Sequence, residues 1–341
     1  MLLNSWSITL LVISAASLFL VGGTVRTAIR VLRFWDTKAD TARQIQLENE
    51  TWLSALLMQY GMVLQLVALL LLVLAADSYS EILVGAMCAT GAFLANDYGI
   101  PLLLVKIAGV FLYGFWIVLH RLDISSEELP LTRVKYLYLL VLAPLVLFDM
   151  ILLVLYLVQL EPDIITSCCG VVFGSAAGDG KNLIGPMPVG LVMSFFYTLA
   201  GVLSVWGFIL FRKIDTAAFP GEKIIGVFFS LFWLIFFCLS LLVITSVISS
   251  YIYGMPFHRC PFDILKKEYG FVGYLIYPTL FSATFLGMSV GVTSLFATNS
   301  ILQESLCVFR KTSLKLCLLL LLLFLAIISW FPAAYFIGGD H

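Results

Sequence analysis

Apolar residues fill most of this chain and gather in long stretches that short polar segments separate. The stretches long enough to cross about 30 Å of hydrocarbon as helices run near 6–25, 51–76, 101–120, 135–159, 188–211, 223–251, 271–293 and 314–337. This pattern predicts an all-α fold, a polytopic integral membrane helical bundle of about eight transmembrane helices. We expect residues 1–341 to form a single transmembrane domain.

The segment 77–97 complicates this picture because its centre is apolar, short and rich in glycine and alanine. It fits a ninth span, a re-entrant loop or an interfacial helix. With eight spans and an outer N-terminus, fourteen Lys and Arg residues fall on the inner side and four on the outer side, as the positive-inside rule requires. A ninth span would move every later loop to the opposite side of the membrane. The sequence therefore predicts eight spans, both termini extracytoplasmic, and a re-entrant or interfacial segment at 77–97.

The composition agrees with a membrane protein, because 62% of the residues are hydrophobic and only 11% are charged. A soluble domain averages roughly 45–50% apolar and about 25% charged residues. The net charge of −1 gives no reason to expect a nucleic-acid partner. The sequence has no Gly-x-x-x-x-Gly-Lys-Ser/Thr pattern, so we expect no nucleotide. We place the chain in a lipid bilayer, the bacterial inner (cytoplasmic) membrane.

The predicted topology gathers scarce ligand residues on the outer, periplasmic side. Four of the seven cysteines lie in the three outer loops, and the third loop adds a histidine and an aspartate close to its cysteine. Thiolates and imidazole select soft transition metals such as Cu or Zn. The metal-site candidates are Cys88, Cys168, Cys169, His258, Cys260 and Asp263. The leading hypothesis is a membrane protein that handles a soft metal ion at this site, within a transport or electron-transfer complex and with a periplasmic metal-carrier protein as partner.

Two alternatives use the same cysteines differently. In the first, Cys168, Cys169, Cys260 and Cys88 act as catalytic thiols of a membrane thiol–disulfide oxidoreductase that exchanges with a periplasmic thiol protein. In the second, disulfides staple the outer loops of a non-catalytic anchor subunit. A partner membrane or cytoplasmic subunit would then dock on the polar connector 31–50.

Two short motifs resemble known thiol proteins. The vicinal pair Cys168-Cys169 resembles the thiol pair of mercuric-ion transport proteins, and Cys260-Pro261-Phe262 resembles a motif of disulfide-exchange membrane enzymes. Each resemblance covers only a few residues, so no family is assigned.

Two ionisable residues lie within predicted spans, Lys106 in the third and Asp149 in the fourth. A charge at this depth costs several kcal/mol unless it is paired or hydrated. The two spans are antiparallel neighbours, so Lys106 reaches toward Asp149. The two residues form a structural ion pair, or Asp149 is protonated and neutral, or they act as an intramembrane relay for a proton or a substrate. Gln59 and Gln65 of the second span are candidates to join such a relay.

The three histidines argue against haem. His120 lies at the inner edge of a span, His258 lies at an outer edge, and His341 is terminal, so no two share a depth. The sequence also has no Cys-x-x-Cys-His motif. We therefore expect neither haem b nor haem c.

Overall fold

The computed structural model describes residues 2–36, 41–163, 188–214, 221–255 and 258–338. The chain forms two compact units, Met1–Thr166 and Ser167–His341. The described residues form helices and no strands. Eight of these helices are long and apolar enough to span a membrane, which confirms the predicted number of spans in the described part of the chain.

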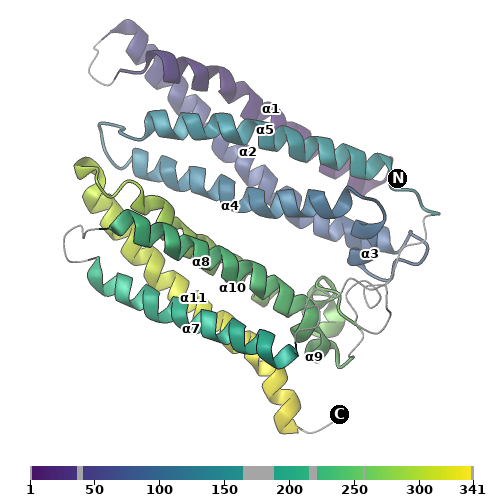
Figure 1. Ribbon diagram of the computed structural model, residues 1–341. Helices are drawn as coiled ribbons and strands as arrows, with labels where there is room; N and C mark the ends of the chain where they lie inside the picture. The colour runs from purple at the N-terminus through teal and green to yellow at the C-terminus, as the bar shows by residue number, and fades with distance from the viewer. Residues whose placement is uncertain (1, 37–40, 164–187, 215–220, 256–257, 339–341) are drawn as a thin grey trace. The chain divides into compact units, whose positions relative to one another are not determined.

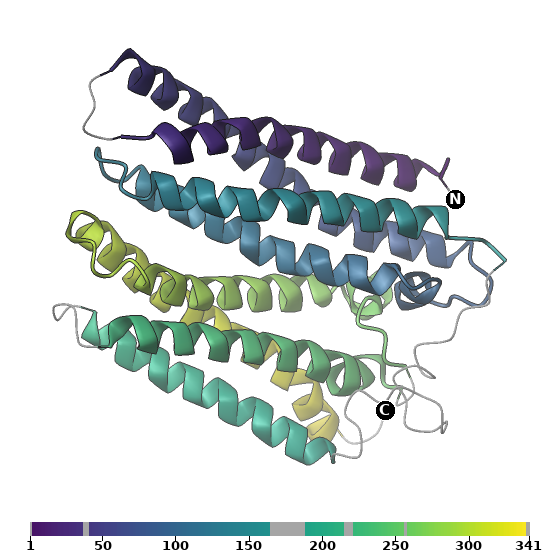
Figure 2. The same ribbon diagram turned by 45° about the horizontal axis from the view of Figure 1, so that its top comes forward.

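The described residues of the first unit form four long helices and one short helix, and the long helices pack as an antiparallel bundle (Figures 1 and 2). Its helices are α1 (Ser5–Phe34), α2 (Ala42–Ser80), α3 (Ala89–Leu94), α4 (Gly99–Asp123) and α5 (Thr132–Val158). Helix α1 packs on α2 and α5, and α4 packs on α2 and α5. The core includes large side chains such as Trp116 and Tyr136, which are fully buried.

Small residues allow α1 and α2 to pack closely. Ser14, Ser17 and Thr24 are fully buried on the α1 face that meets α2. The hydroxyl of Ser17 donates to the carbonyl oxygen of Gly61 at 2.8 Å. A β-carbon at Gly61 would lie only 3.0 Å from Val21 Cγ2. Close backbone approach through small residues is the usual way in which helices associate in lipid.

The segment 77–97 forms no spanning helix. Helix α2 continues to Ser80, and α3 has only six residues, which gives a length of about 9 Å. Helix α3 is held against α5, because Tyr156 donates from its hydroxyl to the carbonyl oxygen of Ala92 at 3.0 Å. The choice between a re-entrant and an interfacial segment stays a prediction.

Helices α1 and α2 take up most of the polar connector 31–50. Helix α1 ends at Phe34 and α2 begins at Ala42. Arg30 and Glu50 form an ion pair across the hairpin, with 2.5 Å between Nη1 and Oε1. Docking of a partner subunit on 31–50 stays a prediction.

The described residues of the second unit also form four long helices, and sequential helices run antiparallel (Figure 2). Its elements are α7 (Val189–Lys213), α8 (Glu222–Val243), the π-helical turn η1 (Ile244–Ile248), α9 (Ser249–Tyr253), the 3₁₀ turns η2 (Asp263–Leu265) and η3 (Lys267–Tyr269), α10 (Gly273–Ser294), the 3₁₀ turn η4 (Ser300–Leu302) and α11 (Gln303–Gly338). Helices α8 and α10 approach closely, because a β-carbon at Gly291 would lie 2.2 Å from the carbonyl oxygen of Gly226.

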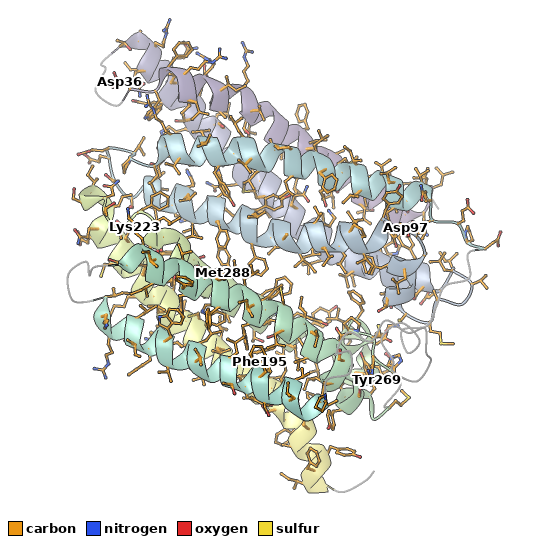
Figure 3. The ribbon with its side chains drawn as sticks, in the orientation of Figure 1. Asp36, Asp97, Phe195, Lys223, Tyr269 and Met288 are labelled. Carbon is orange, nitrogen blue, oxygen red and sulfur yellow. The ribbon has the colours of Figure 1, made fainter. Side chains whose placement is uncertain are left out.

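Each unit has one end rich in Lys and Arg, which we call its basic end. In the first unit this end holds Arg30, Arg33, Arg43, Arg121 and Arg133, and in the second it holds Arg212, Lys213, Lys223, Arg310 and Lys311. Figure 3 labels Asp36 at the basic end of the first unit and Asp97 at its other end, where α3 lies. That the basic ends face the cytoplasm stays a prediction.

Candidate functional site

An ion pair lies inside the first unit, between two of its spanning helices. Lys106 on α4 places Nζ 2.8 Å from Asp149 Oδ2 on α5, and each side chain is only 1% exposed. Gln65 on α2 adds a third group, with Oε1 at 3.5 Å from Lys106 Nζ. Three helices thus each contribute one polar side chain to one point.

The depth of this pair follows from its place in the helices. Lys106 comes seven residues after Gly99, the first residue of α4, which places it about 10 Å from that end of the helix. Asp149 comes seventeen residues after Thr132, the first residue of α5, about 25 Å from the basic end. The charges are therefore well inside the span, where pairing is needed to offset the loss of hydration.

The pair leaves hydrogen-bonding capacity unused. Asp149 Oδ1 and Gln65 Nε2 are buried and form no hydrogen bond of good geometry among the described residues, although the two side chains lie close enough to interact. A carboxylate oxygen accepts and an amide nitrogen donates, so one acceptor and one donor remain beside the ion pair. Tyr113 on α4 is close enough to Asp149 to interact with it electrostatically.

A second buried carboxylate lies at the basic end of the same unit. Asp123, fully buried at the end of α4, accepts three hydrogen bonds. Leu131 donates its N–H to Oδ1 at 2.7 Å. Thr132 donates its hydroxyl to Oδ2 at 2.8 Å, and Lys135 donates from Nζ to Oδ2 at 2.6 Å. This carboxylate thus fixes the start of α5 through hydrogen bonds and neutralises the charge of Lys135.

His120 extends this basic-end cluster toward the centre of the unit. Its Nδ1 lies 3.4 Å from Lys135 Nζ. Its ring stacks on Trp116, with 5.3 Å between ring centroids and 13° between planes. The indole nitrogen of Trp116 is buried and has no hydrogen-bond partner in the described part of the chain.

In the second unit, the predicted ligands of the third outer loop meet near α9. His258 Nε2 lies 2.8 Å from Asp263 Oδ2, and Lys266 Nζ lies 3.1 Å from Asp263 Oδ1. Cys260 Sγ and a carboxylate oxygen of Asp263 lie within 4.8 Å of each other. An ionised carboxylate only accepts hydrogen bonds. In the tautomer in which Nε2 donates this bond, Nδ1 keeps a lone pair.

Tyrosines hold this loop in place. Tyr253, the last residue of α9, donates from its hydroxyl to the carbonyl oxygen of Cys260. The centroid of its ring lies 4.5 Å from the ring centroid of His258 and 4.4 Å from that of Tyr269. Figure 3 labels Tyr269 at this end of the unit. Burial, and then the carboxylate of Asp263, raise the pKa of Tyr269 above its ordinary value. Tyr269 thus stays a neutral phenol at physiological pH.

The predicted site residues fall into three groups. His258, Cys260 and Asp263 lie together in the second unit. Cys88 belongs to the first unit, where it precedes α3 and is buried, and Cys168 and Cys169 lie outside the described residues. Lys106 and Asp149 are in direct contact. Of the two glutamines considered beside them, Gln65 approaches the pair.

Sequence reasoning missed the cluster of His120, Asp123 and Lys135. Charged residues at the basic end of a span are ordinary, so their presence alone did not distinguish these three residues from their neighbours. One signal was present. Asp123 lies three residues after His120 and seven after Trp116, a spacing that puts all three on one face of α4.

No family model, curated protein or solved structure matches this chain. Its class follows from its own features. It is an all-helical, multi-pass integral membrane protein, and its first unit buries two Lys–Asp ion pairs among the described residues.

Proposed function

We propose that the first unit transfers protons across the membrane, with Asp149 and Lys106 as the exchanging groups. The observation that carries the proposal is the ion pair itself. Two side chains, each 1% exposed, hold opposite charges at depth. One carboxylate oxygen makes no hydrogen bond of good geometry among the described residues, and the Gln65 side chain lies close to the carboxylate. Ionisable groups buried in spanning helices commonly mark the path of an ion or proton.

The two groups suffice for a balanced transfer. A proton arriving on Asp149 Oδ1 converts the carboxylate to the neutral acid and leaves Lys106 as an uncompensated cation. An isolated cation at this depth costs several kcal/mol, so Lys106 releases a proton toward the other end of the unit. Rotation of the carboxyl group then brings the proton taken up on Oδ1 to the side of Lys106, where Oδ2 lay 2.8 Å from Nζ, and the acid passes it to the neutral amine. The original ion pair returns, one proton has entered and one has left.

Gln65 has a supporting role in this cycle. Its Oε1 faces Lys106 Nζ, and its amide nitrogen is available to donate. The amide cannot titrate, so it offers hydrogen bonds to the pair in every protonation state.

Proton flux into proteoliposomes tests the proposal. A potassium diffusion potential set by valinomycin drives protons, and an enclosed pH dye reports them. We expect wild-type protein to raise the flux above that of protein-free vesicles, and Asp149→Asn to lower this extra flux at least tenfold, because an amide cannot take up the proton. Asp97→Asn, at an exposed position of the same unit, is the matched control. Wild-type flux equal to that of empty vesicles, or unchanged flux in Asp149→Asn, would refute the proposal.

A second candidate function rests on the loop near α9. We propose that His258 Nδ1 and Cys260 Sγ bind a soft metal ion, Cu or Zn, with Asp263 orienting the imidazole through the other ring nitrogen. A carboxylate on the distal nitrogen is the common support for a metal-bound histidine. Lys266 already neutralises Asp263, which favours this orienting role over direct ligation by the carboxylate.

Metal analysis of the reduced, purified protein after incubation with Zn²⁺ tests this second candidate. We expect about one bound ion per chain at saturating Zn²⁺, with binding weakened in Cys260→Ser and in His258→Ala. Cys307→Ser, near the basic end of the second unit, is the control and should retain the ion. Reduced wild-type protein that binds no Zn²⁺ would remove the candidate.

The thiol–disulfide alternative requires sulfur atoms that a partner can reach. Cys88 is 1% exposed and Cys260 is fully buried. Attack on a disulfide needs access for the thiolate, so exchange at either position would require the surrounding loop to open. Metal binding needs no such opening by a partner protein and is therefore the preferred use of Cys260.

A further inference from the structure

One face of α4 connects the ion pair to the basic-end cluster. Lys106, Tyr113, Trp116, His120 and Asp123 recur at intervals of three, four and seven residues, the spacing of a single helical face. Each of these side chains is at most 5% exposed. A buried face of a spanning helix is usually apolar, so five polar or aromatic hydrogen-bonding groups in a row need an explanation.

These groups follow one another along the unit. A rise of 1.5 Å per residue places Tyr113 about 10 Å, Trp116 about 15 Å and His120 about 21 Å from Lys106 toward the basic end. The ring of Tyr113 narrows the first gap, because it lies over Gly109, where a β-carbon would be 2.8 Å from the ring. The phenol of Tyr113 therefore points back along α4 toward Lys106 and Asp149.

Unpaired polar atoms lie along the same route. Ser54 Oγ and Gln65 Nε2 on α2, Trp116 Nε1 on α4 and Asp149 Oδ1 on α5 are all buried without a hydrogen bond of good geometry in the described ranges. Ser54 lies close enough to Tyr136 to interact with it, and Gln65 close enough to Asp149. Ser54 and Gln65 are eleven residues apart, which is about three turns and one face of α2. Buried polar groups without protein partners are the positions where internal water is held.

We infer that protons pass along this face between the Lys106–Asp149 pair and His120, through water held by Tyr113, Trp116 and Ser54. The inference rests on the proposed function of the first unit and adds a second proton-accepting group to it. His120 relays by taking a proton on one ring nitrogen and losing the hydrogen of the other. Lys135, 3.4 Å from Nδ1, supplies or removes that proton at the basic end. Trp116 keeps its hydrogen throughout and only orients water.

Variants that each remove one polar group test the route in the same vesicle assay. Ser54→Ala removes a hydroxyl that makes no hydrogen bond of good geometry among the described residues, so it is not expected to impair folding. Trp116→Phe removes the indole nitrogen but also puts a smaller ring at a fully buried position, which leaves a cavity that a matched control has to share. We expect each to lower the proton flux about threefold or more, and His120→Phe to lower it at least tenfold. Trp233→Phe is the matched control and should leave flux unchanged. Trp233 is also fully buried with an unpaired indole nitrogen among the described residues, but lies in the second unit.

The outcomes separate the route from the function on which it rests. Wild-type flux in Trp116→Phe, Ser54→Ala and His120→Phe, with flux blocked in Asp149→Asn, overturns the route alone. Unchanged flux in Asp149→Asn overturns the proposed function as well. A similar loss in Trp233→Phe would show that the effect of Trp116→Phe is one of packing, and the route would then be rejected.

Discussion

Asp149→Leu alone is expected to destabilise the first unit by about 3–5 kcal/mol, because it leaves the ammonium of Lys106 buried without its counter-charge. Lys106→Met alone should have an effect of similar size. The double variant should be close to wild type in stability, since two apolar side chains of similar volume replace the pair. Thermal or denaturant unfolding in a mild detergent measures all four proteins as a double-mutant cycle.

The pH dependence of the two single variants should have opposite signs. The lone carboxyl in Lys106→Met sheds its charge by binding a proton, so its stability deficit shrinks as the pH falls. The lone amine in Asp149→Leu sheds its charge by losing a proton, so its deficit shrinks as the pH rises. Additive single effects, or deficits independent of pH, would show that the two groups do not form a desolvated ion pair.

Asp123→Ala is expected to destabilise the first unit by about 3–5 kcal/mol, by the same reasoning for a broken buried pair. The carboxylate is fully buried. Its loss leaves Lys135 without its counter-charge, and the N–H of Leu131 and the hydroxyl of Thr132 without an acceptor. A lower unfolding midpoint, with the largest loss in the α4–α5 hairpin by hydrogen exchange, checks this expectation.

Glu127→Ala provides the control for Asp123. Glu127 lies four residues further along, in the same turn, but its side chain is exposed. Removing an exposed carboxylate should change stability by less than about 0.5 kcal/mol. Equal effects of the two variants would contradict the structural role assigned to Asp123.

The spans were predictable because each is set by length and apolar composition alone, and both are visible in the sequence. The proximity of Lys106 and Asp149 was open to prediction for a similar reason. Consecutive spans joined by a short loop are antiparallel neighbours, and a buried charge in one requires a partner nearby. The helices extend beyond the apolar stretches, as at Phe34 and Ala42, because polar residues continue a helix outside the hydrocarbon.

The grouping of the helices into two units could not be predicted from hydrophobicity. In lipid, the outer face of a helix is as apolar as its buried face, so the hydrophobic pattern does not show which face of each helix is buried. Asp123 and His120 were hidden for a related reason, since charged and aromatic residues at helix ends are common whether or not they are buried. Their burial depends on tertiary contacts with Trp116 and α5 that no local pattern carries.

The π-helical turn Ile244–Ile248 has a consequence for the loop that follows it. A wider turn inserts about one extra residue, which rotates everything after it by roughly 100° relative to a regular helix. Tyr253 thereby meets the carbonyl oxygen of Cys260 and the rings of His258 and Tyr269. In an uninterrupted α8 the phenol of Tyr253 would point to a different side of the helix, and the imidazole of His258 would lose its contact with that aromatic ring.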